Sequence, residues 1–180
     1  IQMCEMMPYS MGLLTALLRR EGFQVDLFDS TFYVDKLNAQ YISYHDYVQE
    51  FDWKEKGRIF KSNIIQDFHK KIEEFDPNLI CVSVVENTYP TAKKMINSLS
   101  QNMKKIPVMW GGVFATFAPH LILKDNVGDY VCIGEGDDAI IEFCKRFHDG
   151  ISVDNTPNFW VKKNGNIIKN KMGGLTNLEE

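Results

Sequence analysis

Short apolar segments alternate with amphipathic segments along most of the chain. The clearest apolar segment, residues 79–85, is apolar nearly throughout and has the length of a buried strand. Between such segments, apolar residues recur at helical spacing, as Leu13, Leu14, Leu17 and Leu18 do. Strands that alternate with helices are typical of a parallel sheet covered by helices on both faces. The sequence therefore predicts an α/β fold with a doubly wound, mostly parallel five-stranded sheet.

The same pattern gives the bounds of the expected elements. We expect strands at residues 1–4, 23–28, 79–85, 106–110 and 129–133. We expect helices at residues 10–21, 61–75, 88–102, 119–123 and 137–147. Because only four residues remain for the first strand, we expect that the chain was cut from a longer protein or is poorly ordered there.

A β-hairpin is expected near the C-terminus, because Asn164 and Gly165 separate two strand-like segments. We therefore divide the chain into a domain of residues 1–150 and a tail of residues 151–180, which contains the hairpin and a linker. Residues 30–60 interrupt the alternation with aromatic side chains among Asp, His and Lys. Loops of this length usually have a function or short helices of their own, so we expect an insertion with one or two helical turns.

Composition and charge disfavour several classes of protein. A net charge of −4 argues against a nucleic-acid partner, which would require a basic surface. We expect no membrane span, since no apolar run approaches the roughly 20 residues that cross a bilayer. The four cysteines lack zinc or iron–sulfur spacing and indicate no disulfide framework, so we expect a cytoplasmic protein and no metal site in this chain. Cys81 and Cys132 lie in apolar runs and are expected in the core.

Glycines stand at two of the strand ends where an open parallel sheet binds its ligands. Gly111 and Gly112 follow the strand at residues 106–110, where they either let the backbone approach a ligand or form a tight turn. The Gly-Glu-Gly run at residues 134–136 leaves the same two alternatives open. The two aspartates after it favour the helix dipole and so have a structural explanation. Glu135 is explained less well in this way.

Other ligand classes fit the sequence less well. The glycine patterns of dinucleotide sites and of phosphate-binding loops are absent, which disfavours NAD and ATP. An acidic pocket of Glu5, Glu86 and Glu135 is disfavoured, because no lysine directly follows a late strand as such a site would need. The four histidines are widely spread, and no spacing indicates a nucleophilic triad. We assign no catalytic residue to this chain.

Four segments, taken in order, resemble the cobalamin-binding domains of cobalamin-dependent radical-SAM enzymes. Those domains carry the patterns P-x-x-x-G-L, P-V-x-x-G-G-x-x-A-T-x-x-P and D-x-x-x-x-G-E-G-E. The matching segments here are residues 8–14 with Gly22, Val25 and Asp29, residues 76–80 with Ser83, residues 107–112 with Ala115, Thr116 and Pro119, and residues 129–137. Each matching segment is a weak signal by itself, but four matching segments in the correct order are fairly specific. The resemblance covers most of the chain outside residues 30–60.

The resemblance implies a flavodoxin- or Rossmann-like fold that holds cobalamin, with the corrin ring on the strand-end loops and its nucleotide tail beside the first helix. It also implies a missing radical-SAM domain with a 4Fe-4S cluster and S-adenosylmethionine, which acts on a small-molecule or peptide substrate. The present chain would be the cofactor-binding part of that methyl-transferring or related radical enzyme, without catalysis of its own. The expected cofactor-binding residues are Ser10, Met11, Gly12, Ser83, Glu86, Gly111, Gly112, Thr116, Gly134, Glu135 and Gly136.

One departure from the resemblance concerns the cobalt ligand. Methionine-synthase-type cobalamin domains carry a cobalt-ligating His in D-x-H-x-x-G, whereas residues 5–10 contain no His, so the lower axial ligand stays open. The alternative function is a degenerate docking or scaffold domain that has kept the fold and lost cobalamin. Its pocket would be blocked by large side chains such as Met7, Met11, Tyr89 and Phe114. A flavin or nucleotide binder is the least favoured function.

Overall fold

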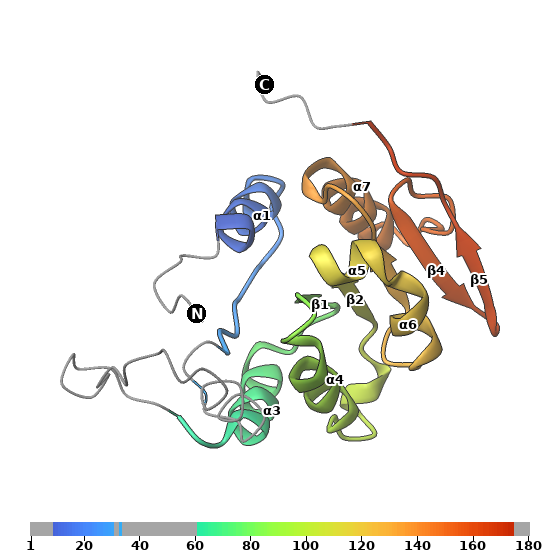
Figure 1. The fold of residues 1–180 in the computed structure, drawn as a ribbon. Coiled ribbons are helices and arrows are strands. Elements are labelled where there is room, and N and C mark those ends of the chain that lie inside the picture. Colours follow the sequence, from blue (N-terminus) through green and yellow to red (C-terminus); the bar gives the residue numbers. More distant parts are fainter. Residues whose placement is uncertain (1–8, 31–32, 34–60, 175–180) are drawn as a thin grey trace, which may run out of the picture. The chain divides into compact units, whose positions relative to one another are not determined.

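The computed structural model describes residues 9–30, 33 and 61–174. The chain divides into two units, residues 27–75 and the remainder, and each is described by itself (Figure 1). The strand expected at residues 1–4 and nearly all of the expected insertion lie outside the described residues. No helix in the described ranges is long and apolar enough to cross a membrane.

The larger unit is built on one mixed sheet of five strands. The strands are β1 (Ile80–Ser83), β2 (Val108–Gly111), β3 (Tyr130–Cys132), β4 (Phe159–Lys163) and β5 (Asn166–Lys169). Their order in the sheet is their order in the sequence. The pairs β1–β2 and β2–β3 are parallel, whereas β3–β4 and β4–β5 are antiparallel. The expected α/β class and C-terminal hairpin are confirmed, and the hairpin strands extend the sheet as two of its five members.

The turn between β4 and β5 has the backbone that its sequence predicts. Asn164 and Gly165 adopt φ values of +52° and +77°, the left-handed pair that a two-residue hairpin of this kind requires. Asparagine and glycine tolerate this conformation better than other residues. The turn of the hairpin is therefore specified by its local sequence.

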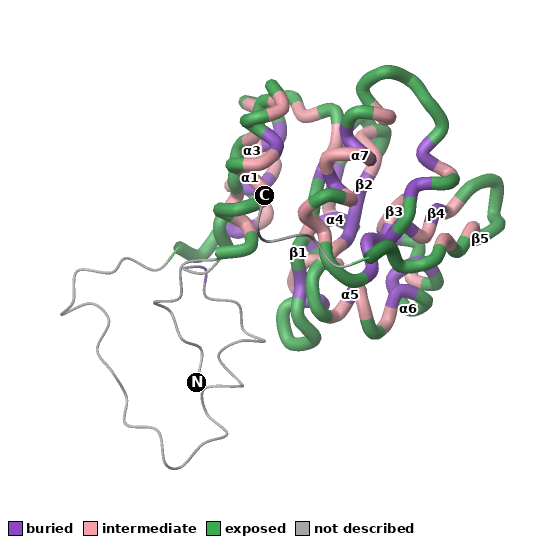
Figure 2. The backbone as a smooth tube through the Cα atoms, turned by 90° about the horizontal axis from the view of Figure 1, so that it is seen from above, coloured by how far each residue is buried: buried purple, intermediate pink, exposed green. Residues whose placement is uncertain are grey.

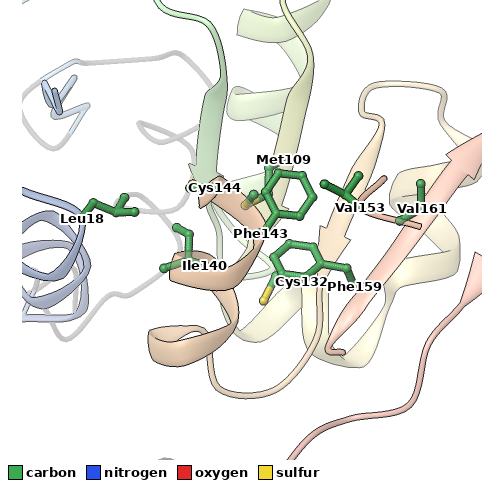
Figure 3. Close-up of a cluster of buried hydrophobic side chains, with 9 residues drawn as sticks. All are labelled: Leu18, Met109, Cys132, Ile140, Phe143, Cys144, Val153, Phe159 and Val161. Atoms are coloured by element: carbon green, nitrogen blue, oxygen red, sulfur yellow. The ribbon is translucent and has the colours of Figure 1, made fainter. Parts of the chain in front are cut away.

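Helices cover both faces of the sheet. They are α1 (Tyr9–Arg20), α4 (Tyr89–Asn97), α5 (Val113–Phe117), α6 (Pro119–Lys124) and α7 (Asp137–His148), with a 3-10 helix at Met103–Lys105. The helices α1 and α7 pack together, and their buried side chains form one cluster with β2, β3 and β4 (Figure 3). The rings of Phe143 and Phe159 lie 4.5 Å apart at its centre, both fully buried.

The opposite face of the sheet is centred on Trp110. This side chain is fully buried, and its indole nitrogen donates to the carbonyl of Val127 at 2.9 Å. The ring of Tyr89 from α4 packs against it edge-on, with centroids 5.5 Å apart. Since side chains alternate along a strand, Met109 joins the α7 cluster while its neighbour Trp110 points the other way. Figure 2 shows β2 as a buried strand between the helices. The doubly wound arrangement is thus confirmed.

The smaller unit is organised by α3 (Ile64–Phe75), which confirms the helix expected over residues 61–75. Phe68 on its apolar face packs its ring 5.3 Å from that of Phe28. The hydroxyl of Tyr33 donates to Asp67 at 2.7 Å. The buried side chains of this helix, four residues apart along one stripe, are Ile64, Phe68 and Ile72.

Several expected elements differ in the structure. Residues 23–28 are described but form no strand, and the carbonyl of Val25 accepts from the Arg19 guanidinium at 2.8 Å. An extended apolar segment becomes a strand only when another strand pairs with its backbone, and no described strand does so here. Cys132 is buried as expected. Cys81 is exposed, against expectation, because β1 is the edge strand of the described sheet.

Two helices also differ from the expected elements. The helix expected over residues 88–102 ends at Asn97, and a separate 3-10 helix follows at Met103–Lys105. The helix α5 (Val113–Phe117) was not expected from the sequence. It begins directly after Gly112 and places its side chains at the mouth of β2.

Candidate functional site

The carboxyl ends of β1, β2 and β3 open into a pocket of about 500 Å³. This is where an open α/β sheet is expected to bind a ligand. Side chains and backbone from α1, the three strand ends, α5 and the segment after β5 line it. The lining residues are Ser10, Ser83, Val84, Val85, Gly112, Val113, Thr116, Phe117, Gly134, Glu135, Asn158, Met172, Gly173 and Gly174.

Gly112 follows β2 and lies against the residues at the carboxyl end of β1. Its φ of +90° and ψ of −175° lie in a region that is essentially restricted to glycine. A Cβ at this position would lie 2.7 Å from the carbonyl oxygen of Val84 and 3.0 Å from the hydroxyl of Ser83. The chain itself therefore requires a glycine here, which supports the tight-turn alternative. Gly112 also lines the pocket, so the two alternatives that its sequence left open are compatible.

Thr116 joins the mouth of β2 to that of β3. Its hydroxyl accepts from the backbone nitrogen of Gly134 at 3.0 Å and donates to the carbonyl of Gly112 at 3.2 Å. A hydroxyl has one proton to donate, and here the proton is used within the protein. Thr116 thus shapes the pocket by tying two loops together.

Gly134 adopts a φ of +76° and lies against Met172. A Cβ on Gly134 would approach the Met172 sulfur to 3.2 Å. Gly134 therefore lines the pocket, with the side chain of Met172 beside it.

The electrostatics near the mouth of β3 are acidic. Burial raises the pKa of the Asp137 carboxyl, and the neighbouring charges of Glu135 and Asp138 raise it further. Asp137 and Asp138 stand in the first turn of α7, where carboxylates interact favourably with the helix dipole. No group of three His, Cys, Asp or Glu residues that would hold a metal ion occurs in the part of the chain that the structure describes.

Six of the eleven expected cofactor-binding residues line the pocket and five do not. Those that line it are Ser10, Ser83, Gly112, Thr116, Gly134 and Glu135. Those that do not are Met11, Gly12, Glu86, Gly111 and Gly136. Gly136 instead precedes α7 as its N-cap, which is a structural role. Direct contact of any of the eleven with a cofactor stays a prediction.

Three of the four large side chains that would mark a blocked pocket are described, and none of them lines it. Tyr89 is buried against the rings of Trp110 and Phe114, and its hydroxyl donates to Asp125 at 2.7 Å. Neither Met11 nor Phe114 lines the pocket, and Met7 lies outside the described residues.

Sequence reasoning missed the lining residues Val84, Val85, Val113, Phe117, Asn158, Met172, Gly173 and Gly174. One signal was available for two of them, since Val113 and Phe117 flank the Ala115–Thr116 pair of the third resembling segment. Their side chains are 60% and 81% exposed, and together with Val85 they form an apolar rim. For Asn158 and Met172 the local sequence contains no signal, because the tertiary fold alone brings them to the pocket.

Comparisons with known proteins agree with this fold. A family model described as the B12 binding domain matches residues 5–143. The chain therefore belongs to the B12-binding domain family. None of the curated proteins matches it.

Solved structures with the same fold include two cobalamin-dependent enzymes. The radical S-adenosylmethionine methyltransferase TsrM from Kitasatospora setae, with tryptophan substrate and a SAM analogue bound, is 19% identical with a TM-score of 0.66 over 92% of this chain. A second TsrM structure, with cobalamin and a [4Fe-4S] cluster bound, has a TM-score of 0.64. The cobalamin-dependent S-adenosylmethionine radical enzyme OxsB, with aqua-cobalamin bound, is 16% identical with a TM-score of 0.66 over 92% of this chain. This chain spans 27% of the TsrM chain and 20% of the OxsB chain.

The pocket residues fit a corrinoid. Backbone of Gly112 and Gly134 lines the pocket at the strand ends, with the Met172 side chain beside Gly134. The rim is apolar and exposed on one side, at Val113 and Phe117. Since cobalamin is larger than a 500 Å³ cavity, it would extend from the pocket over this rim.

Proposed function

We propose that this chain binds cobalamin in the strand-end pocket and serves as the cofactor-binding part of a longer radical-SAM methyltransferase or related radical enzyme. The observation that carries the proposal is a pocket at the carboxyl ends of β1, β2 and β3, with Gly112 and Gly134 in its lining, in a member of the B12-binding domain family. The solved structures support a place for this fold within a longer radical enzyme, since it makes up 27% of the TsrM chain and 20% of the OxsB chain.

The residues of the pocket divide into two roles in this proposal. Ser10 and Ser83 bring hydroxyls to the pocket, and Gly112 and Gly134 bring backbone that a planar ring can approach. Thr116 positions the loops rather than binding the ligand, because its proton is already donated to a carbonyl. When bound, cobalamin supplies a cobalt centre that carries a methyl group.

The remaining chemistry of such an enzyme belongs to parts outside this chain. We propose that S-adenosylmethionine and a 4Fe-4S cluster are held by a further domain, which also takes the small-molecule or peptide substrate. A cytoplasmic location is part of the same proposal, because both the cluster and free cysteines need a reducing compartment.

The test is retention of cobalamin by the purified chain. We expect hydroxocobalamin to remain with the protein after desalting, with a visible corrin absorbance near one equivalent. Ser10→Trp should reduce the affinity at least tenfold, because Ser10 is an exposed pocket residue and an indole there fills the cavity without a buried clash.

The matched control is Ser100→Trp, the same substitution at an exposed position after α4 that does not line the pocket. It should bind cobalamin as the unmodified chain does. Absence of retention by the unmodified chain would overturn the proposal and favour the docking domain that has lost cobalamin. Equal binding by both variants would place the cobalamin site elsewhere.

A further inference from the structure

Asn158 connects three separate segments at the edge of the pocket. The side chain is buried, with 6% exposure, and its amide nitrogen donates to the carbonyl of Glu135 at 2.7 Å. Its amide oxygen accepts from the backbone nitrogen of Gly173. Its backbone nitrogen donates to Lys171 at 3.0 Å, and its carbonyl accepts from Ile133 at 2.8 Å. One residue therefore binds the end of β3, the loop after it and the segment after β5.

These bonds hold residues 171–174 across the mouth of β3. Met172 is thereby placed beside Gly134, and Gly173 and Gly174 continue the same wall of the pocket. The side chain of Met172 is 59% exposed, so little burial holds the segment in place. Glycines lose more conformational freedom on ordering than other residues. The position of the segment therefore depends on two bonds to Asn158, one from the Gly173 amide to its side chain and one from its backbone nitrogen to the carbonyl of Lys171.

The hairpin itself does not need these bonds. Asn170, at the end of β5, donates from its amide nitrogen to the carbonyls of Asp154 and Phe159, each at 2.8 Å. The pairing of β4 with β3 fixes the hairpin to the sheet. Because the hairpin is anchored independently, the contacts of Asn158 with Glu135 and Gly173 act on the pocket wall.

We propose that Asn158 is a positioning residue of the cofactor site, and that Met172–Gly174 form a wall against which bound cobalamin rests. The inference depends on the proposed function and adds a part of the site after the sheet's last strand. The wall belongs to the segment that follows β5. Occupancy of the pocket and the order of this segment are then coupled, so cobalamin should slow hydrogen exchange at the Gly173 amide.

The direct test uses Asn158→Gly in the full chain. Asn158 has a φ of +66°, which glycine adopts without strain, so the substitution removes the two side-chain bonds and leaves the backbone unstrained. The matched control is Asn164→Gly, which makes the same change at a φ of +52° in the hairpin turn, away from the pocket. We expect Asn158→Gly to weaken hydroxocobalamin binding roughly tenfold. We also expect faster exchange at Gly173 and a change in the visible bands of the bound corrin.

Two further variants separate positioning from general stability. Asn158→Asp keeps an acceptor for the Gly173 amide but sets a carboxylate against the Glu135 carbonyl oxygen, so it should weaken binding as Asn158→Gly does. Met172→Ala leaves every bond of Asn158 intact and should still weaken binding, because the wall loses its side chain. If Asn158→Gly does not fold, Met172→Ala by itself tests whether Met172–Gly174 form a wall of the cobalamin site.

The outcomes distinguish the inference from the proposed function. If the unmodified chain does not bind hydroxocobalamin, the proposed function fails and this inference fails with it. If the unmodified chain binds and both Asn158→Gly and Met172→Ala bind equally well, only the wall is refuted. Weakened binding by these two, with Asn164→Gly unchanged, supports the wall.

Discussion

Replacing Gly112 with alanine should lower the free energy of unfolding of the larger unit, because a Cβ there would meet backbone atoms of Val84. The new Cβ would lie 2.7 Å from the carbonyl oxygen of Val84 and 2.9 Å from its nitrogen. Neither atom is free to move, because the Val84 nitrogen donates to Gly111 and the carbonyl accepts from Phe114, both at 3.1 Å. The substitution therefore strains the junction of β1, β2 and α5.

The expected magnitude has two parts. A backbone held at φ +90° and ψ −175° costs about 1–3 kcal/mol for a residue with a Cβ. Overpacking against fixed backbone atoms costs about 1–3 kcal/mol more. The two parts add to roughly 2–6 kcal/mol, and we expect Gly112→Ala to reduce the free energy of unfolding by about 4 kcal/mol, the middle of that range. Since domains have about 5–15 kcal/mol in total, the variant should still fold.

The assay is urea unfolding followed by circular dichroism, compared with Gly150→Ala. Gly150 has a φ of +65° and open space around the position of a Cβ, so that variant has backbone strain of about 1 kcal/mol and no clash. Gly112→Ala should have the lower midpoint, with the denaturant slope unchanged. A loss for Gly112→Ala no larger than that for Gly150→Ala would refute the close contact with Val84.

Two more predictions concern the polar contacts of the larger unit. Thr116→Val removes the hydroxyl that joins Gly134 to Gly112, so we expect the free energy of unfolding to fall by about 1–2 kcal/mol and the Gly134 amide to exchange faster. Thr116→Ser should keep the stability and the slow exchange of the unmodified chain. Unchanged exchange in the valine variant would contradict the bond between Thr116 and Gly134. Hydrogen bonds from Lys93 and Tyr89 hold the pKa of Asp125 below 3.8, so its stabilising effect is present above that value and disappears as the pH falls through the lowered pKa. Asp125→Asn should therefore cost about 0.5–1 kcal/mol at pH 7 and nothing at a pH below the lowered pKa, measured by unfolding at both; a difference that persists in acid would show that the ion pair is not its source.

Local pattern determined the parts of this protein whose contacts are close in sequence. The stripe of Ile64, Phe68 and Ile72 predicts α3, because four-residue spacing aligns side chains on one helix face. Asn164 and Gly165 predict the hairpin, because few residues adopt two successive left-handed conformations. The glycines at the ends of β2 and β3 located the pocket, since parallel strands bring their carboxyl ends to one edge of the sheet.

Only the tertiary structure decided how the carboxyl ends of β1, β2 and β3 are joined and which distant residues line the pocket. Residues 23–28 have the composition of a strand and form none, because pairing depends on a neighbour that the segment itself does not specify. Thr116 meets Gly134 across 18 residues, and Asn158 meets Glu135 across 23. Such contacts leave no periodicity in the sequence, since they depend on where whole strands are placed. Periodicity records which face of an element is buried, whereas a pocket wall is made by elements that meet only after folding.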